Sequence, residues 1–240
     1  MPGIRITVAD GPDGFDRAAA DEIGSTIGAC PRAAVVVATG RTPMGAYARL
    51  AEDLSPDATG DLRVFQLDEY LGIPRSDPRS LASWTRRSFV EPLGIDPASV
   101  YWFDAMADVP DAECRRYEGA VAEAGGFDLA VLGLGRNGHL GFNEPPSDPM
   151  SGTRVVPLTE ASLASNAAYV PGKPVPTEAF TAGLDLLLAT RRVVLVVSGR
   201  TKHEIVHLAL DGPVTAEVPA SFLQEHPDLA VVVDADAWGA

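Results

Sequence analysis

The chain has 240 residues, of which 46% are hydrophobic and 22% charged, a composition that excludes a disordered protein and is sufficient for a buried core. Its formal net charge of −14 excludes adventitious binding to nucleic acid, because a phosphate backbone requires a cationic surface. No apolar run reaches the length of a membrane span, and the first residues lack a signal-peptide pattern. Two cysteines, Cys30 and Cys114, do not suggest a disulfide framework. We therefore expect one cytoplasmic domain over residues 1–240, without nucleic-acid or membrane partners.

Short apolar runs alternate with amphipathic stretches along the whole chain. In chain order, strands are expected over residues 4–8, 34–38, 63–67, 127–132, 193–197 and 229–233. Helices are expected over residues 13–27, 42–53, 111–124, 177–189 and 201–210. Strands that are apolar throughout are typical of sheets covered on both faces, and intervening helices indicate parallel crossovers. The pattern predicts the α/β class: a doubly wound, mostly parallel, Rossmann-like sheet with helices on both faces.

The first strand end with unusual chemistry follows residues 34–38. In a doubly wound sheet, ligands bind beyond the carboxyl ends of the strands, so the residues after each strand are candidates for a site. Here they are Thr39, Gly40, Arg41 and Thr42. Glycine permits close backbone approach, and free amides at a helix start can hold a phosphate. The alternative is a plain turn that Thr42 caps, but the guanidinium of Arg41 favours a phosphate site.

Two adjacent carboxylates, Asp68 and Glu69, follow the strand expected over residues 63–67. Apolar surroundings would raise the pKa of such a carboxyl toward the range that suits a general base. Taken alone, the pair is better explained as a solvated loop acid beside a helix-capping acid. Its position at a strand end, alongside the other junctions, favours a role in chemistry.

The loop at residues 133–145 reads GLGRNGHLGFNEP and follows the strand expected over residues 127–132. Its glycines allow tight bends around Asn137, His139 and Glu144. His139 can exchange protons near neutral pH, Glu144 can fix its tautomer, and Asn137 can orient the ring or a substrate oxygen. A histidine with an ordinary polar role is the alternative, but the nearby carboxylate and the glycines favour a proton relay.

The last junction, residues 198–202, reads SGRTK and is a second strand-to-helix turn with two cations. Lys202 could clamp a phosphate there, although basic residues are common in a first helical turn. In an acidic protein, converging cations favour the phosphate site. His203 and His207 share a helix face, but they lack the glutamate of a HExxH motif and have no further ligands at suitable spacing, so no metal is expected.

Taken in order, four segments resemble the glucosamine-6-phosphate deaminase family. They are ATGRTPMGAY, FQLDEYLGIP, GLGRNGHLGFNEP and VSGRTK, and they span nearly the whole chain. The resemblance implies that Asp68 moves a proton between C2 and C1, and that His139, supported by Asn137 and Glu144, opens the sugar ring. It implies no cofactor and an amino-sugar phosphate as the small-molecule partner. The predicted substrate contacts are Thr39, Gly40, Arg41, Thr42, Glu69, Gly135, Arg136, Gly138 and Lys202.

The chain departs from the family pattern at three positions. Deaminases usually carry an Asn-x-Arg-Tyr/Phe stretch whose arginine holds the phosphate, whereas residues 166–169 here read NAAY, with Ala168 in the arginine position. Arg41 is the candidate to supply the missing guanidinium. Leu81 stands where a tyrosine is expected, and Val156 stands where allosterically regulated members carry a lysine. Effector control is therefore not expected.

These departures leave three alternatives open. A dehydratase would use Asp68 and His139 to eliminate the C3 hydroxyl of N-acetylglucosamine 6-phosphate. A 6-phosphogluconolactonase would use His139 to activate water, but the FNEP sequence argues against it. A sugar-phosphate sensor would bind without turnover, but the retained acid/base groups argue against it. The sequence leaves open a monomer or a homo-oligomer, and it leaves open whether residues 158–176 close over the site or form a packed helix.

Overall fold

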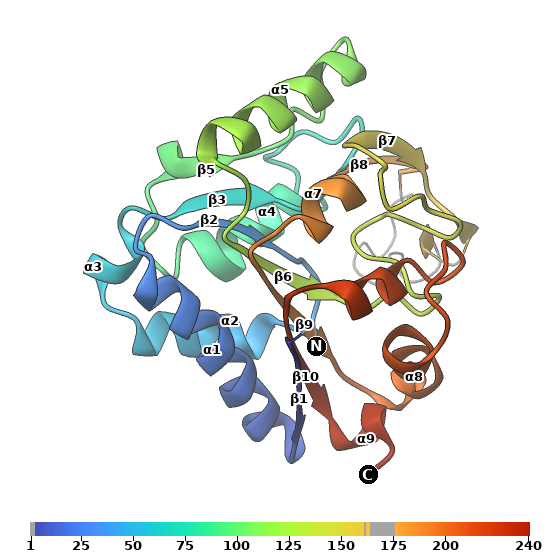
Figure 1. The fold of residues 1–240 in the computed structure, drawn as a ribbon. Coiled ribbons are helices and arrows are strands. Elements are labelled where there is room, and N and C mark those ends of the chain that lie inside the picture. Colours follow the sequence, from blue (N-terminus) through green and yellow to red (C-terminus); the bar gives the residue numbers. More distant parts are fainter. Residues whose placement is uncertain (1–2, 161, 164–175) are drawn as a thin grey trace.

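The computed structural model describes residues 3–160, 162–163 and 176–240. Its centre is a seven-stranded sheet in which every pair of neighbouring strands is parallel (Figure 1). In spatial order the strands are β1 (Gly3–Ala9), β10 (Asp228–Asp234), β9 (Arg192–Val197), β6 (Leu129–Gly133), β2 (Ala34–Val37), β3 (Arg63–Gln66) and β5 (Val100–Tyr101). All six predicted strands are confirmed, and β5 is a short additional edge strand.

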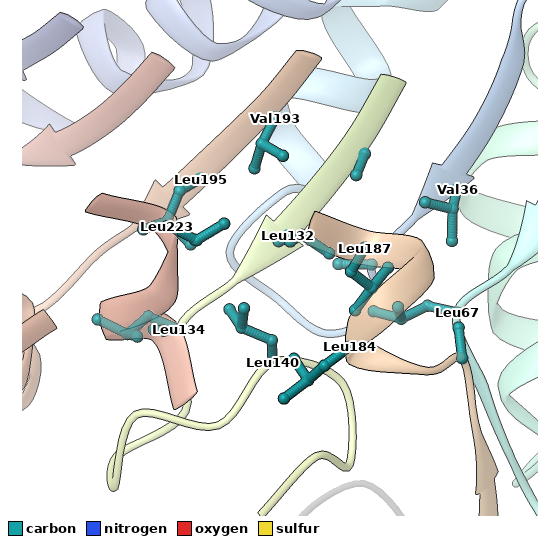
Figure 2. Close-up of a cluster of buried hydrophobic side chains, with 14 of the residues drawn as sticks. Val36, Leu67, Leu132, Leu134, Leu140, Leu184, Leu187, Val193, Leu195 and Leu223 are labelled. Carbon is teal, nitrogen blue, oxygen red and sulfur yellow. The ribbon is translucent and has the colours of Figure 1, made fainter. Parts of the chain in front are cut away.

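Helices cover both faces of this sheet, which confirms the doubly wound α/β prediction. One face packs against α1 (Gly11–Ala29), α2 (Met44–Asp53) and a π-helix (Arg86–Val90). The other packs against α5 (Pro110–Ala124), α7 (Leu184–Leu188), α8 (His203–Asp211) and a 3-10 helix (Pro219–Glu225). Successive strand residues serve opposite faces, since Val35 joins the first layer and Val36 the second. Figure 2 shows Leu184, Leu187 and Leu223 packed over β6 and β9 in the second layer.

The remaining elements are short. They are α3 (Pro56–Thr59), α4 (Leu81–Thr85), α9 (Ala235–Trp238) and 3-10 turns at Pro97–Ser99 and Arg200–Lys202. The 3-10 turn delays the start of α8 to His203, and α2 begins at Met44 with Pro43 as its N-cap, so Thr42 does not cap it. Within the described residues, no helix is both long and apolar enough to cross a membrane.

A small antiparallel sheet, absent from the sequence prediction, stands beside the main one. Its order is β4 (Asp68–Tyr70), β8 (Glu178–Thr181) and β7 (Arg154–Pro157). The helix predicted over residues 177–189 is therefore wrong in its first half, and only α7 is helical. The reason is tertiary: Phe180 is fully buried and its ring stacks on Phe103 at 5.2 Å, while the backbone of β8 pairs with strands on both sides.

The strand order reverses direction between β2 and β6. From β2 the chain continues outward through β3 to β5, whereas from β6 it continues through β9 and β10 in the opposite direction. Adjacent loops therefore leave the carboxyl ends of β2 and β6 on diverging paths and open a crevice at that edge. The four segments predicted from the sequence to carry site residues follow β2, β3, β6 and β9, so they all begin at this edge of the sheet.

Candidate active site

A cavity of about 400 Å³ lies at this reversal point. Its wall includes ten of the thirteen residues predicted for the site, contributed by four separate junctions. These are Thr39, Gly40, Arg41, Thr42, Asp68, Gly135, Arg136, Asn137, His139 and Lys202. The other three, Glu69, Gly138 and Glu144, are not among the lining residues. The convergence follows from the sheet, because parallel strands bring their carboxyl ends to one edge.

Asp68 supplies a buried carboxylate to the cavity. Its side chain belongs to β4, and the residue is only 5% exposed. The Oδ1 atom is buried and has no hydrogen-bond partner within the part of the chain that the structure describes. Burial, reinforced by the charge of Glu69, raises the pKa of Asp68 from 3.8 to about 7. A carboxyl group with this pKa and a free oxygen can accept and return a proton near neutral pH.

Glu69 is placed differently from the sequence prediction, which made it a substrate contact. Successive residues of β4 point to opposite sides, so Asp68 and Tyr70 line the cavity while Glu69 faces away from it. Its carboxylate is 1% exposed and accepts five hydrogen bonds from protein donors. A carboxylate so fully occupied belongs to the framework behind the cavity wall.

His139 and Glu144 form the ion pair of the loop at residues 133–145. Nδ1 of His139 lies 3.0 Å from Oε1 of Glu144. Asn137 donates from Nδ2 to Oε2 of Glu144 at 2.6 Å, and Ser162 donates to Oε1. Burial alone would raise the pKa of Glu144, but the hydrogen bond and charge of His139, with the donors Ser162 and Asn137, lower it to about 2. Glu144 is therefore ionised near neutral pH and places a negative charge behind the imidazole.

Two glycines shape the loop around the imidazole. A Cβ on Gly135 would lie 2.2 Å from Cδ2 of His139, so only glycine lets the backbone pass this close to the ring. Gly138 has a φ of +86°, and a Cβ there would lie 2.7 Å from Cγ1 of Val218. Gly138 was predicted to contact substrate, whereas in the structure it forms the backbone bend next to His139. On either side of His139, Leu134 and Leu140 insert into the core (Figure 2).

Asn143 fixes the second half of the same loop, a role that the sequence analysis missed. Its Nδ2 donates to the carbonyl oxygens of Leu140 and Ala182, each at 2.9 Å. Its Oδ1 accepts a hydrogen bond of 2.8 Å from Nη1 of Arg154, which lies on β7. Asn143 is fully buried, so these bonds hold the FNEP segment against the small sheet.

Cationic side chains and the turn after β2 also line the cavity. Gly40, in the turn after β2, has a φ of +95°, a conformation that favours glycine. Lys202 donates from Nζ to the carbonyl of Leu134 at 2.5 Å, which directs the ammonium group to the cavity. Burial and, to a lesser extent, the charge of Arg136 lower the pKa of Lys202 to about 8. A cation held in this way gains most from an anionic ligand, which suits a phosphate.

Residues around α4 form a further wall of the cavity, which was not predicted from the sequence. Pro78, Arg79, Leu81 and Trp84 line the cavity from this side. Arg79 is held by Asp77, with Nη2 lying 2.8 Å from Oδ2. Leu81, noted in the sequence as a departure, is thus a wall residue. No pattern in the sequence indicated this segment.

The structure describes only part of the remaining predictions. Val156 packs beside Tyr70 and Phe142 in a small apolar cluster. Ala168 lies outside the described residues, as does most of the segment at residues 158–176 that was proposed as a cover. Within the described residues, no group of three or more His, Cys, Asp or Glu side chains could hold a metal ion.

Comparisons with known proteins agree with this geometry. Residues 12–232 match the family described as glucosamine-6-phosphate isomerases/6-phosphogluconolactonase. The glucosamine-6-phosphate deaminase of Cutibacterium acnes is 43% identical over 235 residues, which cover 96% of this chain and 90% of that protein. The structure of a monomeric glucosamine-6-phosphate deaminase is similar, with a TM-score of 0.92, 35% identity and coverage of 98% and 99% of the two chains.

A more distant likeness concerns the fold alone. The 6-phosphogluconolactonase of Trypanosoma brucei superposes with a TM-score of 0.76 at 22% identity, over 99% of this chain and 98% of that one. The chain therefore belongs to the family of glucosamine-6-phosphate isomerases and 6-phosphogluconolactonases.

Proposed function

We propose that this protein deaminates glucosamine 6-phosphate to fructose 6-phosphate and ammonia. The observation that carries the proposal is that one cavity joins the buried carboxyl of Asp68, the imidazole of His139 and a cationic end at Lys202. Similarity to relatives named glucosamine-6-phosphate deaminase, at up to 43% identity, supports the same reaction.

The substrate phosphate binds at the cationic end. Backbone amides of residues 39–42 and the ammonium group of Lys202 hold it, and Arg41 and Arg136 line the same cavity. The sugar then extends toward Asp68 and His139, and it contacts the backbone of Gly135, which lines the cavity. No cofactor is needed, because every step is a proton transfer or a hydrolysis.

His139 opens the sugar ring in the first step. It transfers a proton to the ring oxygen while the C1 hydroxyl loses one, which breaks the C1–O5 bond and forms an open-chain aldehyde. The anionic Glu144 lies against Nδ1 of His139 and orients the imidazole, and Asn137 holds Glu144 in place by its hydrogen bond.

Asp68 then moves a proton between two carbons. Its carboxylate removes the C2 proton, a C1–C2 double bond forms as the C1=O π bond of the aldehyde breaks, and the aldehyde oxygen takes up a proton. The same carboxyl group then returns a proton to C1 while the nitrogen lone pair forms the C2=N bond and the nitrogen loses a proton. The product is an imine at C2, which one water molecule hydrolyses to the ketone, releasing ammonia. The pKa of about 7 suits this task, since the group must both accept and donate near neutral pH.

A comparison of three substrates tests the proposal. The protein is incubated with glucosamine 6-phosphate, N-acetylglucosamine 6-phosphate and 6-phosphogluconolactone, while ammonia, ultraviolet absorbance and acid are followed. We expect ammonia from the first substrate only. Absorbance from the second would indicate a dehydratase, acid from the third a lactonase, and binding without any product a sensor; each of these results would contradict the proposal.

The same proposal extends to the organisation of the protein. A single domain over residues 1–240 is supported by the adjacency of β1 and β10, which pair the two ends of the chain in one sheet. A cytoplasmic location is supported by the charge of a sugar phosphate, which does not cross a membrane unaided. The likeness to a monomeric deaminase favours a monomer over a homo-oligomer, and sedimentation velocity distinguishes the two.

A further inference from the structure

Glu69 is a buried carboxylate that the proposed reaction does not use. It is 1% exposed, and both of its oxygens accept hydrogen bonds. Oε1 accepts from the backbone amides of Tyr70 and Leu81, at 2.8 and 2.9 Å. Oε2 accepts from Nε2 of Gln66, Oγ of Ser80 and the amide of Ala82, at 3.0, 2.6 and 2.8 Å. In each bond the acceptor is the carboxylate of Glu69, which is shielded from solvent, and charge-assisted hydrogen bonds are strongest in such an environment.

These bonds join two parts of the cavity wall. Three of the five donors belong to Ser80, Leu81 and Ala82, which are the N-cap and first residues of α4. Glu69 therefore satisfies amides that the first turn of a helix leaves open. Between β4 and α4 the chain crosses about ten residues of turns and bends, so local structure alone does not set the distance between the two elements.

Asp68 precedes Glu69 in β4, and the start of α4 carries Leu81 and Trp84 into the cavity. We propose that Glu69 is a positioning residue for Asp68, whose carboxylate locks β4 to α4 so that the base and the facing wall are held as one unit. The inference rests on the proposed function, because it assigns Asp68 as the base.

Charge gives the same residue a second effect on Asp68. The carboxylate of Glu69 adds to the effect of burial and raises the pKa of its neighbour. Tyr117 from α5 is also electrostatically coupled to Asp68, but burial and that charge raise its pKa well above 10, so it stays neutral. The other charged or titratable groups of the cavity are Arg41, Tyr70, Arg79, Arg136, His139 and Lys202. Glu69 is a like charge beside Asp68, and its removal leaves these groups in place.

Two variants separate positioning from charge. Glu69→Gln keeps the size of the side chain but removes the charge and turns one oxygen into a donor. Ser80→Ala removes one donor to Glu69, together with the N-cap acceptor of the Ser83 amide, and keeps the charge of Glu69. The side-chain carboxyl of Asp68 is titrated by carbon-13 NMR in the wild type and both variants, with Asp68→Asn to assign its signal. KM and kcat for glucosamine 6-phosphate are measured in parallel across pH, and thermal unfolding establishes that each variant is folded.

We expect Glu69→Gln to move the titration midpoint of the Asp68 carboxyl about one pH unit lower, and to move the acid limb of the kcat–pH profile by the same amount. We expect Ser80→Ala to leave that midpoint unchanged and to lower kcat/KM about fivefold or more, since one charge-assisted bond is lost. An unmoved midpoint in folded Glu69→Gln, or an unchanged kcat/KM in Ser80→Ala, would overturn the inference. If Glu69→Gln does not fold, Ser80→Ala alone decides. A wild type that binds the sugar phosphate but never releases ammonia refutes the proposed function instead, and the NMR midpoint still tests Glu69.

Discussion

Nδ1 of His139 lies 3.0 Å from Oε1 of Glu144, and the Nδ2 atom of Asn137 lies 2.6 Å from the other oxygen of that carboxylate. The carboxylate orients the imidazole for the proton transfer of the ring-opening step. Glu144→Gln should therefore lower kcat about 100-fold, as expected when a general acid loses its partner. Ammonia release measures kcat, and fructose 6-phosphate binding should stay within about twofold of wild type.

Ser162→Ala is the matched control for that variant. It removes another contact to Glu144 while leaving the ion pair with His139 intact. A much smaller loss is expected, of a few-fold, since a neutral donor contributes less than the charged pair. Equal losses in the two variants would show that the ion pair has no special role.

Gly135 makes room for the imidazole, because a Cβ there would lie 2.2 Å from Cδ2 of His139. Gly135→Ala should displace the ring and lower kcat by at least about 100-fold. The control is Gly119→Ala in α5, where a Cβ meets nothing within 4 Å. That change should keep full activity and stabilise the fold by up to about 1 kcal/mol. Retained activity in Gly135→Ala would mean that the ring position is not critical.

Arg41 is the candidate to replace the guanidinium that the sequence lacks at Ala168. Arg41→Ala should raise KM about tenfold or more, with little change in kcat, because a phosphate contact acts in binding rather than in proton transfer. Lys202→Met should raise KM at least as much, since its ammonium group lines the same cavity. An unchanged KM for Arg41→Ala in steady-state kinetics would rule out the compensation.

Asp68 should lower the stability of the fold at high pH. Its pKa of about 7 in the folded protein exceeds the ordinary value of 3.8, so the folded state binds the proton more tightly. Stability should therefore fall as pH rises from about 4 to about 7 and then level off. Asp68→Asn should stabilise the protein at pH 8 by up to about 4 kcal/mol, and this gain should vanish near pH 4. Urea unfolding at both pH values measures the difference; an equal effect at both would contradict it.

Much of the site could be predicted because its residues follow the strands directly. Thr39, Asp68, His139 and Lys202 lie far apart in sequence, yet each follows a strand whose carboxyl end faces one edge. The alternation of apolar runs and helices predicted a parallel sheet, and a parallel sheet places these four residues at one edge.

The errors arose where tertiary pairing decides the structure. Glu69 was grouped with Asp68 because the sequence does not reveal that residues 68–70 form a strand with alternating sides. The helix expected over residues 177–189 failed because the backbone of Phe180 pairs with β4 and β7. Trp84 reaches the cavity through the contact of α4 with Glu69, which is a long-range relationship without a local sequence signal.

The central claim is that Asp68 is the carbon base of an amino-sugar phosphate deaminase. An NMR time course in D₂O, with glucosamine 6-phosphate and either wild type or Asp68→Asn, tests it most directly. We predict that wild type forms fructose 6-phosphate and ammonia in equal amounts. It should also exchange the C2 proton of the remaining glucosamine 6-phosphate with solvent. Asp68→Asn should still bind the sugar phosphate but show neither product nor exchange. Persistent C2 exchange in Asp68→Asn, or bound substrate without ammonia in the wild type, would contradict the claim.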